Sequence, residues 1–227
     1  KQSSKHPDGL FIAIDPASHE SSRMGLAAIT VLKNQITVVG IASVPAKRCA
    51  VIEIQVIVAE FIANVKKIVP LTPIVFIIEC NNSSVYASSI LSAARRAATT
   101  YPVLNPFTTD NFPSEITPNV GPWTTHMNKY AAVEATLVVM LDRSIDIHPN
   151  CQTVGTTAVD PHAAPTTLAS SLQILGGELK RIADDGRKIG GKASGLEDDV
   201  AMALMLVVYW HKVIKLKAAR NPIQFYV

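Results

Sequence analysis

Apolar residues are arranged along the chain in two alternating patterns. Short uninterrupted apolar runs predict buried strands, and longer stretches with apolar residues every three or four positions predict helices packed by one face. Turn-forming residues separate these segments. The predicted strands are residues 10–14, 25–32, 36–43, 74–78, 101–104 and 145–148, and the predicted helices are residues 48–69, 84–98, 128–141, 166–183 and 196–217.

The order of these elements predicts an α/β fold with a central mixed β-sheet flanked by helices. Only Lys33-Asn34-Gln35 separates the second and third strands, which favours an antiparallel hairpin. The later strands alternate with helices, a pattern typical of parallel pairing. We expect a single domain over residues 1–227, with flexible tails at 1–8 and 218–227 and long loops at 105–125 and 149–165.

The composition is that of a globular protein. Of the 227 residues, 48% are hydrophobic and 17% are charged, which excludes a disordered chain. The net charge of +3 is too small to indicate nucleic-acid binding by itself. The widely spaced cysteines argue against structural zinc and a disulfide framework, and thus favour a reducing compartment. No membrane span or signal peptide is predicted. Because Lys1 rather than Met comes first, we expect a processed product or an excised domain.

Carboxylates occur at the predicted strand ends and at the start of the last helix, where the functional sites of α/β sheets usually lie. Asp15 ends the first predicted strand, Glu79 follows the strand at 74–78, and Asp198-Asp199 begin the last helix. Ligands of open α/β sheets collect at strand ends, and acids brought together there repel one another unless a cation offsets their charge. Oxygen-only ligands suit Mg²⁺ or Mn²⁺, and two such ions can support phosphodiester cleavage.

Each acid also has a structural interpretation. Asp15 before Pro16 is a common start of a turn. Glu79 could form an ion pair with Arg95 or Arg96, and Asp198-Asp199 could complement the helix dipole. Taken together, buried acids at one sheet edge favour a metal site over these separate interpretations.

The residues around the acids resemble, in order, the motifs of one protein family. The family is the C-terminal nuclease domain of the terminase large subunit of herpesviruses and tailed phages, and this chain looks like a divergent member. One departure is Cys80, which stands where the family carries Gly. The similar segments are Asp15-Pro16-Ala17 with Gly25, Glu79 to Ser84 (ECNNSS), Asn128-Lys129 with Glu134, and Gly191-Lys192 with Gly195 and Asp198-Asp199.

This resemblance implies an RNase H-like fold and a metal-dependent endonuclease that cuts concatemeric viral DNA during genome packaging. It implies that Asp15, Glu79 and Asp198 or Asp199 bind two Mg²⁺ or Mn²⁺ ions, with Asp15 bridging them and Glu79 also positioning water. Lys129 would lie near the site and contact phosphate. Double-stranded DNA, other terminase subunits and the portal are the implied partners. The implied location is the host nucleus for a herpesvirus-like protein or the bacterial cytoplasm for a phage-like one.

The family's ATPase motor is not expected within this chain, since it has no GxxxxGK[ST] motif. A Gly-rich loop carrying Arg187, Lys188 and Lys192 precedes the last helix, and it could either grip the DNA backbone or be an ordinary solvated loop. Trp123 and Trp210 are predicted to be a loop anchor and a core residue rather than base-stacking platforms.

Two other functions stay open at this stage. The chain could be a different RNase H-like nuclease, such as a junction resolvase or RNase H itself. It could also be a non-catalytic module for DNA docking or assembly. In the nuclease interpretation we expect little sequence preference, because backbone contacts position a protein on DNA without reading bases.

Overall fold

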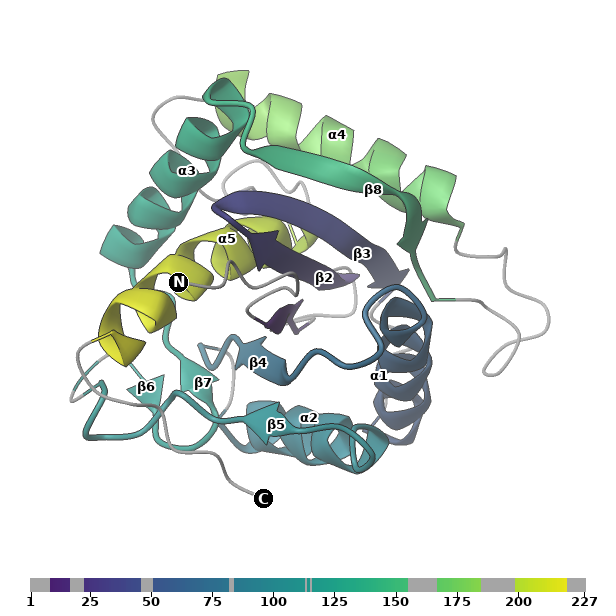
Figure 1. Cartoon of the computed structure of the whole chain (residues 1–227), viewed down its shortest axis with the longest axis vertical. Helices are drawn as coiled ribbons and strands as arrows, with labels where there is room; N and C mark the ends of the chain where they lie inside the picture. The colour runs from purple at the N-terminus through teal and green to yellow at the C-terminus, as the bar shows by residue number, and fades with distance from the viewer. Residues whose placement is uncertain are drawn as a thin grey trace.

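The computed structural model describes residues 9–16, 23–45, 51–81, 84–112, 114, 116–154, 167–184 and 199–219. Five helices and eight strands are described in this part of the chain (Figure 1). The strands are β1 (Leu10–Asp15), β2 (Arg23–Leu32), β3 (Gln35–Pro45), β4 (Ile74–Ile78), β5 (Val103–Leu104), β6 (Ile116–Thr117), β7 (Gly121–Pro122) and β8 (Ile145–Gln152). The helices are α1 (Val51–Lys66), α2 (Ser84–Ala97), α3 (His126–Leu141), α4 (Leu168–Asp184) and α5 (Asp199–Ala218).

The main sheet is mixed, as predicted, with the strand order β5-β4-β1-β2-β3-β8. β2 is antiparallel to both of its neighbours, β1 and β3, whereas β1–β4, β4–β5 and β3–β8 are parallel pairs. The carboxyl ends of all the other strands of this sheet therefore lie at one edge, together with the amino end of β2. β1 is hydrogen-bonded on both sides over nearly its whole length.

The loop between β2 and β3 is one residue shorter than the three-residue loop predicted from the sequence. Leu32 pairs with Gln35, so the loop consists of Lys33 and Asn34. Both have positive φ, 51° and 69°, which is the backbone conformation of a type I′ turn. This turn matches the twist of the strands and fixes their register.

Two hydrophobic clusters lie on opposite faces of the sheet. Side chains alternate between faces along a strand, so Leu10, Ile12 and Ile14 of β1 pack with residues of α1 and α2, and Phe11 and Ala13 pack with residues of α3, α4 and α5. Figure 1 shows α1 to the right of the sheet and α5 and α3 to its left. The central strand is thus covered on both faces.

Helix α5 lies within the core. From Asp199 to Val208 every residue is buried. Trp210 is 2% exposed and forms edge-to-face contacts with Phe107 and Phe112. The predictions of a buried helix and of a core position for Trp210 are confirmed.

The structure differs from the sequence prediction at residues 105–125, which were expected to be loop. A two-stranded ribbon, β6–β7, forms within them. The ribbon packs against the end of β4, since a β-carbon on Gly121 would lie 2.1 Å from the carbonyl oxygen of Ile78. A contact between segments distant in sequence stabilises this ribbon, and local periodicity does not report such contacts.

Two other element ends differ from prediction. β8 continues to Gln152 beside β3, beyond the predicted end at residue 148. Helix α1 ends at Lys66 instead of residue 69. The Lys66 ammonium donates to the carbonyl oxygen of Thr72 at 2.6 Å and lies 4.1 Å from the centre of the Tyr101 ring, so it holds the turn that follows α1.

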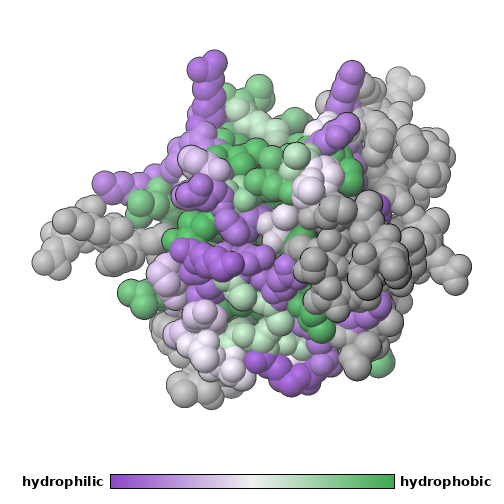
Figure 2. Space-filling view, turned by 90° about the vertical axis from the view of Figure 1, so that its right-hand side faces the viewer, coloured by the Kyte–Doolittle hydropathy of each residue, from purple (hydrophilic) through white to green (hydrophobic). Residues whose placement is uncertain are grey.

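The outer surface carries both polar and apolar residues. Figure 2 shows the side on which α1 lies, where hydrophilic and hydrophobic residues share the face. Of the helices that the structure describes, none combines the length and the hydropathy needed to cross a membrane.

Candidate functional site

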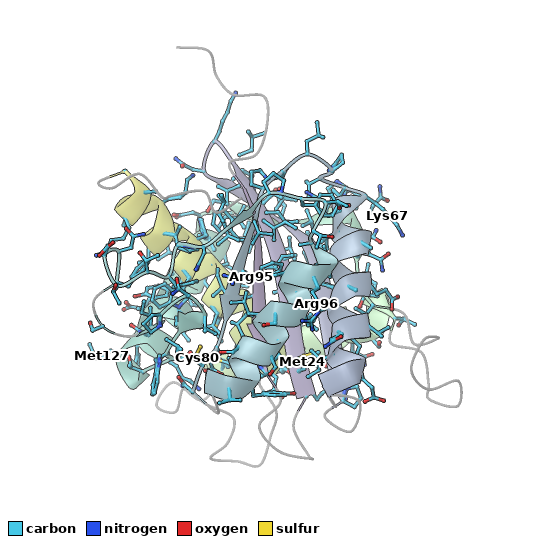
Figure 3. The ribbon with its side chains drawn as sticks, turned by 90° about the horizontal axis from the view of Figure 1, so that it is seen from below. Met24, Lys67, Cys80, Arg95, Arg96 and Met127 are labelled. Carbon is cyan, nitrogen blue, oxygen red and sulfur yellow. The ribbon has the colours of Figure 1, made fainter. Side chains whose placement is uncertain are left out.

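Asp15 and Glu79 lie at the ends of neighbouring parallel strands. Asp15 is the last residue of β1, and the backbone N–H of Glu79 donates to the carbonyl oxygen of Ile14 at 3.1 Å. This bond continues the β1–β4 ladder by one residue. Figure 3 shows Cys80, which follows Glu79, and Met24 of β2 at one end of the sheet, with Lys67 at the other.

Strand alternation places both carboxylates on the face that α5 covers. Ala13 and Ile77 belong to the cluster around α5, and Asp15 and Glu79 are each two residues further along the same strand direction. Both are nearly buried, with 6% and 7% of their surface exposed. Neighbouring buried carboxylates need a cation or hydrogen-bond donors to offset their repulsion.

The start of α5 is held against the same edge. Asp15 pairs with Gly25, and a β-carbon on Gly25 would lie 2.1 Å from the carbonyl oxygen of Asp199. The backbone N–H of Arg23 donates to Oδ2 of Asp199 at 2.8 Å. Asp199, the first residue of α5, is 7% exposed. The structure therefore brings Asp15, Glu79 and Asp199 to one end of the sheet.

The predicted alternative of an ion pair between Glu79 and Arg95 or Arg96 is wrong. Helix α2 packs on the opposite face, and the Arg95 guanidinium donates to the carbonyl oxygen of Asn119 at 3.5 Å. Arg95 and Arg96 lie in the last turn of α2 and are labelled in Figure 3. No described residue forms a hydrogen bond or ion pair with the Glu79 carboxylate, which leaves its oxygens available to a cation.

The acids fit a divalent cation by their chemistry, although the described side chains do not enclose one. Among the described residues, no three His, Cys, Asp or Glu side chains are grouped closely enough to hold a metal ion. Asp199 directs one oxygen to the backbone of Arg23, and Asp198 lies outside the described residues. The donors at this edge are carboxylate oxygens, which is the set that Mg²⁺ and Mn²⁺ prefer.

Arg23 is a residue of this edge that the sequence reasoning missed. Its Nε donates to the Ser43 hydroxyl, and its Nη2 donates to the Ser43 carbonyl oxygen at 3.1 Å. By alternation along β2, Arg23 lies on the same face as Gly25, and its guanidinium is fixed on Ser43 of β3. It was missed because the strand was predicted to begin at residue 25, whereas β2 begins at Arg23.

A second connection brings the start of α3 to the same edge. The backbone N–H of Cys80 donates to the Pro122 carbonyl oxygen at 3.0 Å. The Asn81 side chain forms two hydrogen bonds with the backbone of Thr124, each of 2.6 Å. Asn81 thus joins the end of β4 to the segment before α3.

Lys129 belongs to the first turn of α3. Thr125 caps this helix, and its hydroxyl accepts from the backbone N–H of Asn128 at 3.2 Å. Figure 3 shows Met127 at the same end of the molecule as Cys80. Lys129 is half-buried, and the helix that carries it begins at this end of the molecule.

Four predicted site residues lie outside the described residues, namely Asp198, Arg187, Lys188 and Lys192. Trp123, predicted to be a loop anchor, is 47% exposed, and its indole N–H donates to the Thr117 hydroxyl at 2.8 Å. Its ring thus braces the β6–β7 ribbon.

A cavity of about 380 Å³ lies elsewhere, among β3, β8 and α3–α5. Its lining is largely apolar and includes Val38, Leu179 and Leu204. Val38 pairs with Ile29, which pairs with Phe11, so the cavity is level with the amino-terminal part of β1, away from Asp15. It does not contain the acids and is not the candidate site.

Comparison with known proteins gives matches at the level of structure. No protein-family model matches the sequence, and no curated protein matches it. The Mn-soaked nuclease domain of human cytomegalovirus terminase superposes with a TM-score of 0.68 at 17% identity, covering 96% of this chain and 88% of that chain. The Mn-soaked, inhibitor-bound form gives a TM-score of 0.67 at 16% identity, covering 92% and 85%.

RuvC of T. thermophilus, in complex with a Holliday junction substrate, gives a TM-score of only 0.41 at 13% identity, covering 96% of this chain and 99% of that chain. A score at this level carries no argument. The TM-scores of 0.67 and 0.68 with the cytomegalovirus terminase nuclease domain show that the chain has the RNase H-like fold predicted from its sequence. The low identity with that domain is consistent with a divergent sequence.

Proposed function

We propose that this chain is the nuclease domain of a terminase large subunit, an endonuclease that cuts concatemeric viral DNA during genome packaging. The observation that carries the proposal is the meeting of Asp15, Glu79 and the start of α5 at one sheet edge. A fold shared with the cytomegalovirus terminase nuclease domain supports it.

In this proposal Asp15, Glu79 and the Asp198-Asp199 pair hold two Mg²⁺ or Mn²⁺ ions. When bound, such ions supply an activated water and stabilise the leaving oxygen of the phosphodiester. Asp15, on the central strand, and Glu79, whose carboxylate no described residue engages, would each help to hold the ions. Glu79 would also orient the attacking water.

The basic residues near the edge would act on the phosphate. Lys129, at the start of α3, contacts the scissile phosphate and offsets the charge that develops on it. Arg187, Lys188 and Lys192 contact the DNA backbone. Backbone contacts carry no base information, so cleavage has little sequence preference, and the choice of cutting site comes from partners. We propose other terminase subunits and the portal as those partners, with the host nucleus or the host bacterium's cytoplasm as the location.

A substrate panel tests the reaction. The purified chain is incubated with linear duplex DNA, a four-way junction and an RNA–DNA hybrid, each with Mn²⁺, Mg²⁺ or EDTA. The expected result is cutting of the linear duplex only when a divalent ion is present. Cleavage confined to the junction would favour a resolvase, and cleavage confined to the hybrid would favour RNase H.

Variants of the acids separate a nuclease from a DNA-docking module. Asp15→Ala and Glu79→Ala are expected to lose metal-dependent cleavage while still binding duplex DNA. Asp110→Ala is the matched control, because this aspartate is exposed in a distant loop. If Asp15→Ala and Glu79→Ala cut as well as the parent, these residues are not catalytic.

A further inference from the structure

Glu178 is a buried acid on the apolar side of α4. It is 1% exposed and lies one turn after Leu175, a residue of the hydrophobic cluster around α5. Helical periodicity predicts an apolar residue at this position. Burial of a carboxylate is unfavourable unless hydrogen bonds compensate, so the position calls for a specific partner.

That partner is the first turn of α5. Oε2 of Glu178 accepts a hydrogen bond from the backbone N–H of Ala201 at 2.7 Å. Ala201 is the third residue of α5, and the first N–H groups of a helix have no acceptor within the helix. A carboxylate at a helix N-terminus also interacts favourably with the helix dipole. Glu178 thus caps α5 from another helix.

The same turn is held from the side of the sheet. Asp199 accepts from the backbone N–H of Arg23, and its carbonyl oxygen fills the space above Gly25. The start of α5 is therefore fixed between β2 and Glu178 of α4. Asp199 begins this turn, so the turn determines where its carboxylate lies relative to Asp15.

We propose that Glu178 is a positioning residue of the metal site. It touches neither ions nor substrate, and acts by setting the position of Asp199 through the Ala201 N–H. This inference rests on the proposed function. Partners that orient metal ligands typically influence metal affinity by roughly 10- to 100-fold.

The experiment compares Glu178→Leu with Glu178→Gln. Leucine fills the space but accepts no hydrogen bond, whereas glutamine keeps an acceptor oxygen and loses only the charge. Mn²⁺ affinity is measured by titration calorimetry, and cleavage of linear duplex is measured in parallel. We expect Glu178→Leu to weaken Mn²⁺ binding by about 10-fold or more and Glu178→Gln to retain most of the affinity.

Two controls separate positioning from general stability. Leu175→Ala removes packing from α4 one turn before Glu178 and leaves the Ala201 bond in place, so it should bind Mn²⁺ like the parent at a temperature where it remains folded. Duplex binding in EDTA should be the same in all variants. Equal loss of Mn²⁺ affinity in Leu175→Ala and Glu178→Leu, or parental affinity in Glu178→Leu, would overturn the positioning role.

The outcome for the parent protein tells the two proposals apart. If the parent neither binds Mn²⁺ nor cuts DNA, the proposed function itself fails. If the parent binds Mn²⁺ and Glu178→Leu binds it equally well, the proposed function stands and the role of Glu178 is rejected.

Discussion

The carbonyl oxygen of Asp199 lies 2.1 Å from the point at which a side chain on Gly25 would begin. Gly25 lies within β2 and forms no turn. The absence of a side chain at this position allows the backbone of α5 to pack directly against the strand. The backbone of α5 thus comes very near the sheet beside Asp15, with which Gly25 pairs.

Gly25→Ala should destabilise the protein, because its methyl group and the Asp199 backbone cannot occupy the same space. We expect a loss of about 1–3 kcal/mol in the free energy of unfolding, measured by urea denaturation, and a loss of cleavage. Gly177→Ala is the control. It lies within α4, where an added β-carbon meets no atom within 4 Å, and it should stabilise the protein by about 0.5–1 kcal/mol. Equal stability of the two variants would contradict this account.

Asp15→Asn and Glu79→Gln should each remove the stabilisation given by Mn²⁺. An ion at 100 times its dissociation constant stabilises a folded protein by about 2.7 kcal/mol, and thermal unfolding with Mn²⁺ or with EDTA measures the difference. In EDTA the variants should be as stable as the parent or more so, since neutralising one carboxylate relieves repulsion. Glu134→Gln, on the exposed side of α3, should keep the Mn²⁺ effect.

The two adjacent aspartates should differ in their contributions. Asp199 already engages one oxygen with the Arg23 N–H, and asparagine can keep that acceptor. We therefore expect Asp198→Asn to abolish cleavage, and Asp199→Asn to reduce it by a smaller factor. Single-turnover cleavage of duplex DNA at saturating Mn²⁺ gives the comparison. The reverse ranking would make Asp199 the principal ligand.

His211 should make the protein sensitive to acid. It is 3% exposed, and burial, with a smaller effect of Lys212, lowers its pKa from 6.5 to about 4. Between these values the unfolded chain binds a proton that the folded chain does not. Stability is therefore fully present above pH 6.5 and decreases as the pH falls towards 4, by about 3 kcal/mol at most.

His211→Leu tests this origin of the acid sensitivity. Urea unfolding at pH 7 and pH 4.5 should show a smaller loss of stability in the variant than in the parent. The carboxylates are the same in both proteins, so they cancel in the comparison. Parallel pH dependences would show that His211 titrates alike in the folded and unfolded states.

The main sheet could be predicted because its strands are short apolar runs between strong turn signals. The Lys33-Asn34 hairpin and the acids after β1 and β4 follow directly from local sequence. The β6–β7 ribbon could not be predicted, since it depends on Gly121 packing against Ile78, a contact between distant segments.

The residues that support the candidate site could not be predicted from the local sequence either. Arg23 and Glu178 look like an ordinary surface cation and an ordinary helical acid. Their roles appear only when β2, β3, α4 and α5 are packed together. Asp15 and Glu79 could be recognised because each ends or follows an apolar run that predicts a strand. Nothing in the local sequence of Arg23 or Glu178 indicates the contacts that they make.

The acids of the candidate site are far apart in the sequence, and this determines when they can come together during synthesis. Asp15 is made before Asp199, which is carried by the last described helix. An emerging chain therefore holds Asp15 and Glu79 without their third carboxylate until α5 leaves the ribosome and packs beneath β1 and β2. A nascent or prematurely terminated chain cannot assemble the edge, so unfinished copies should leave the DNA around them uncut.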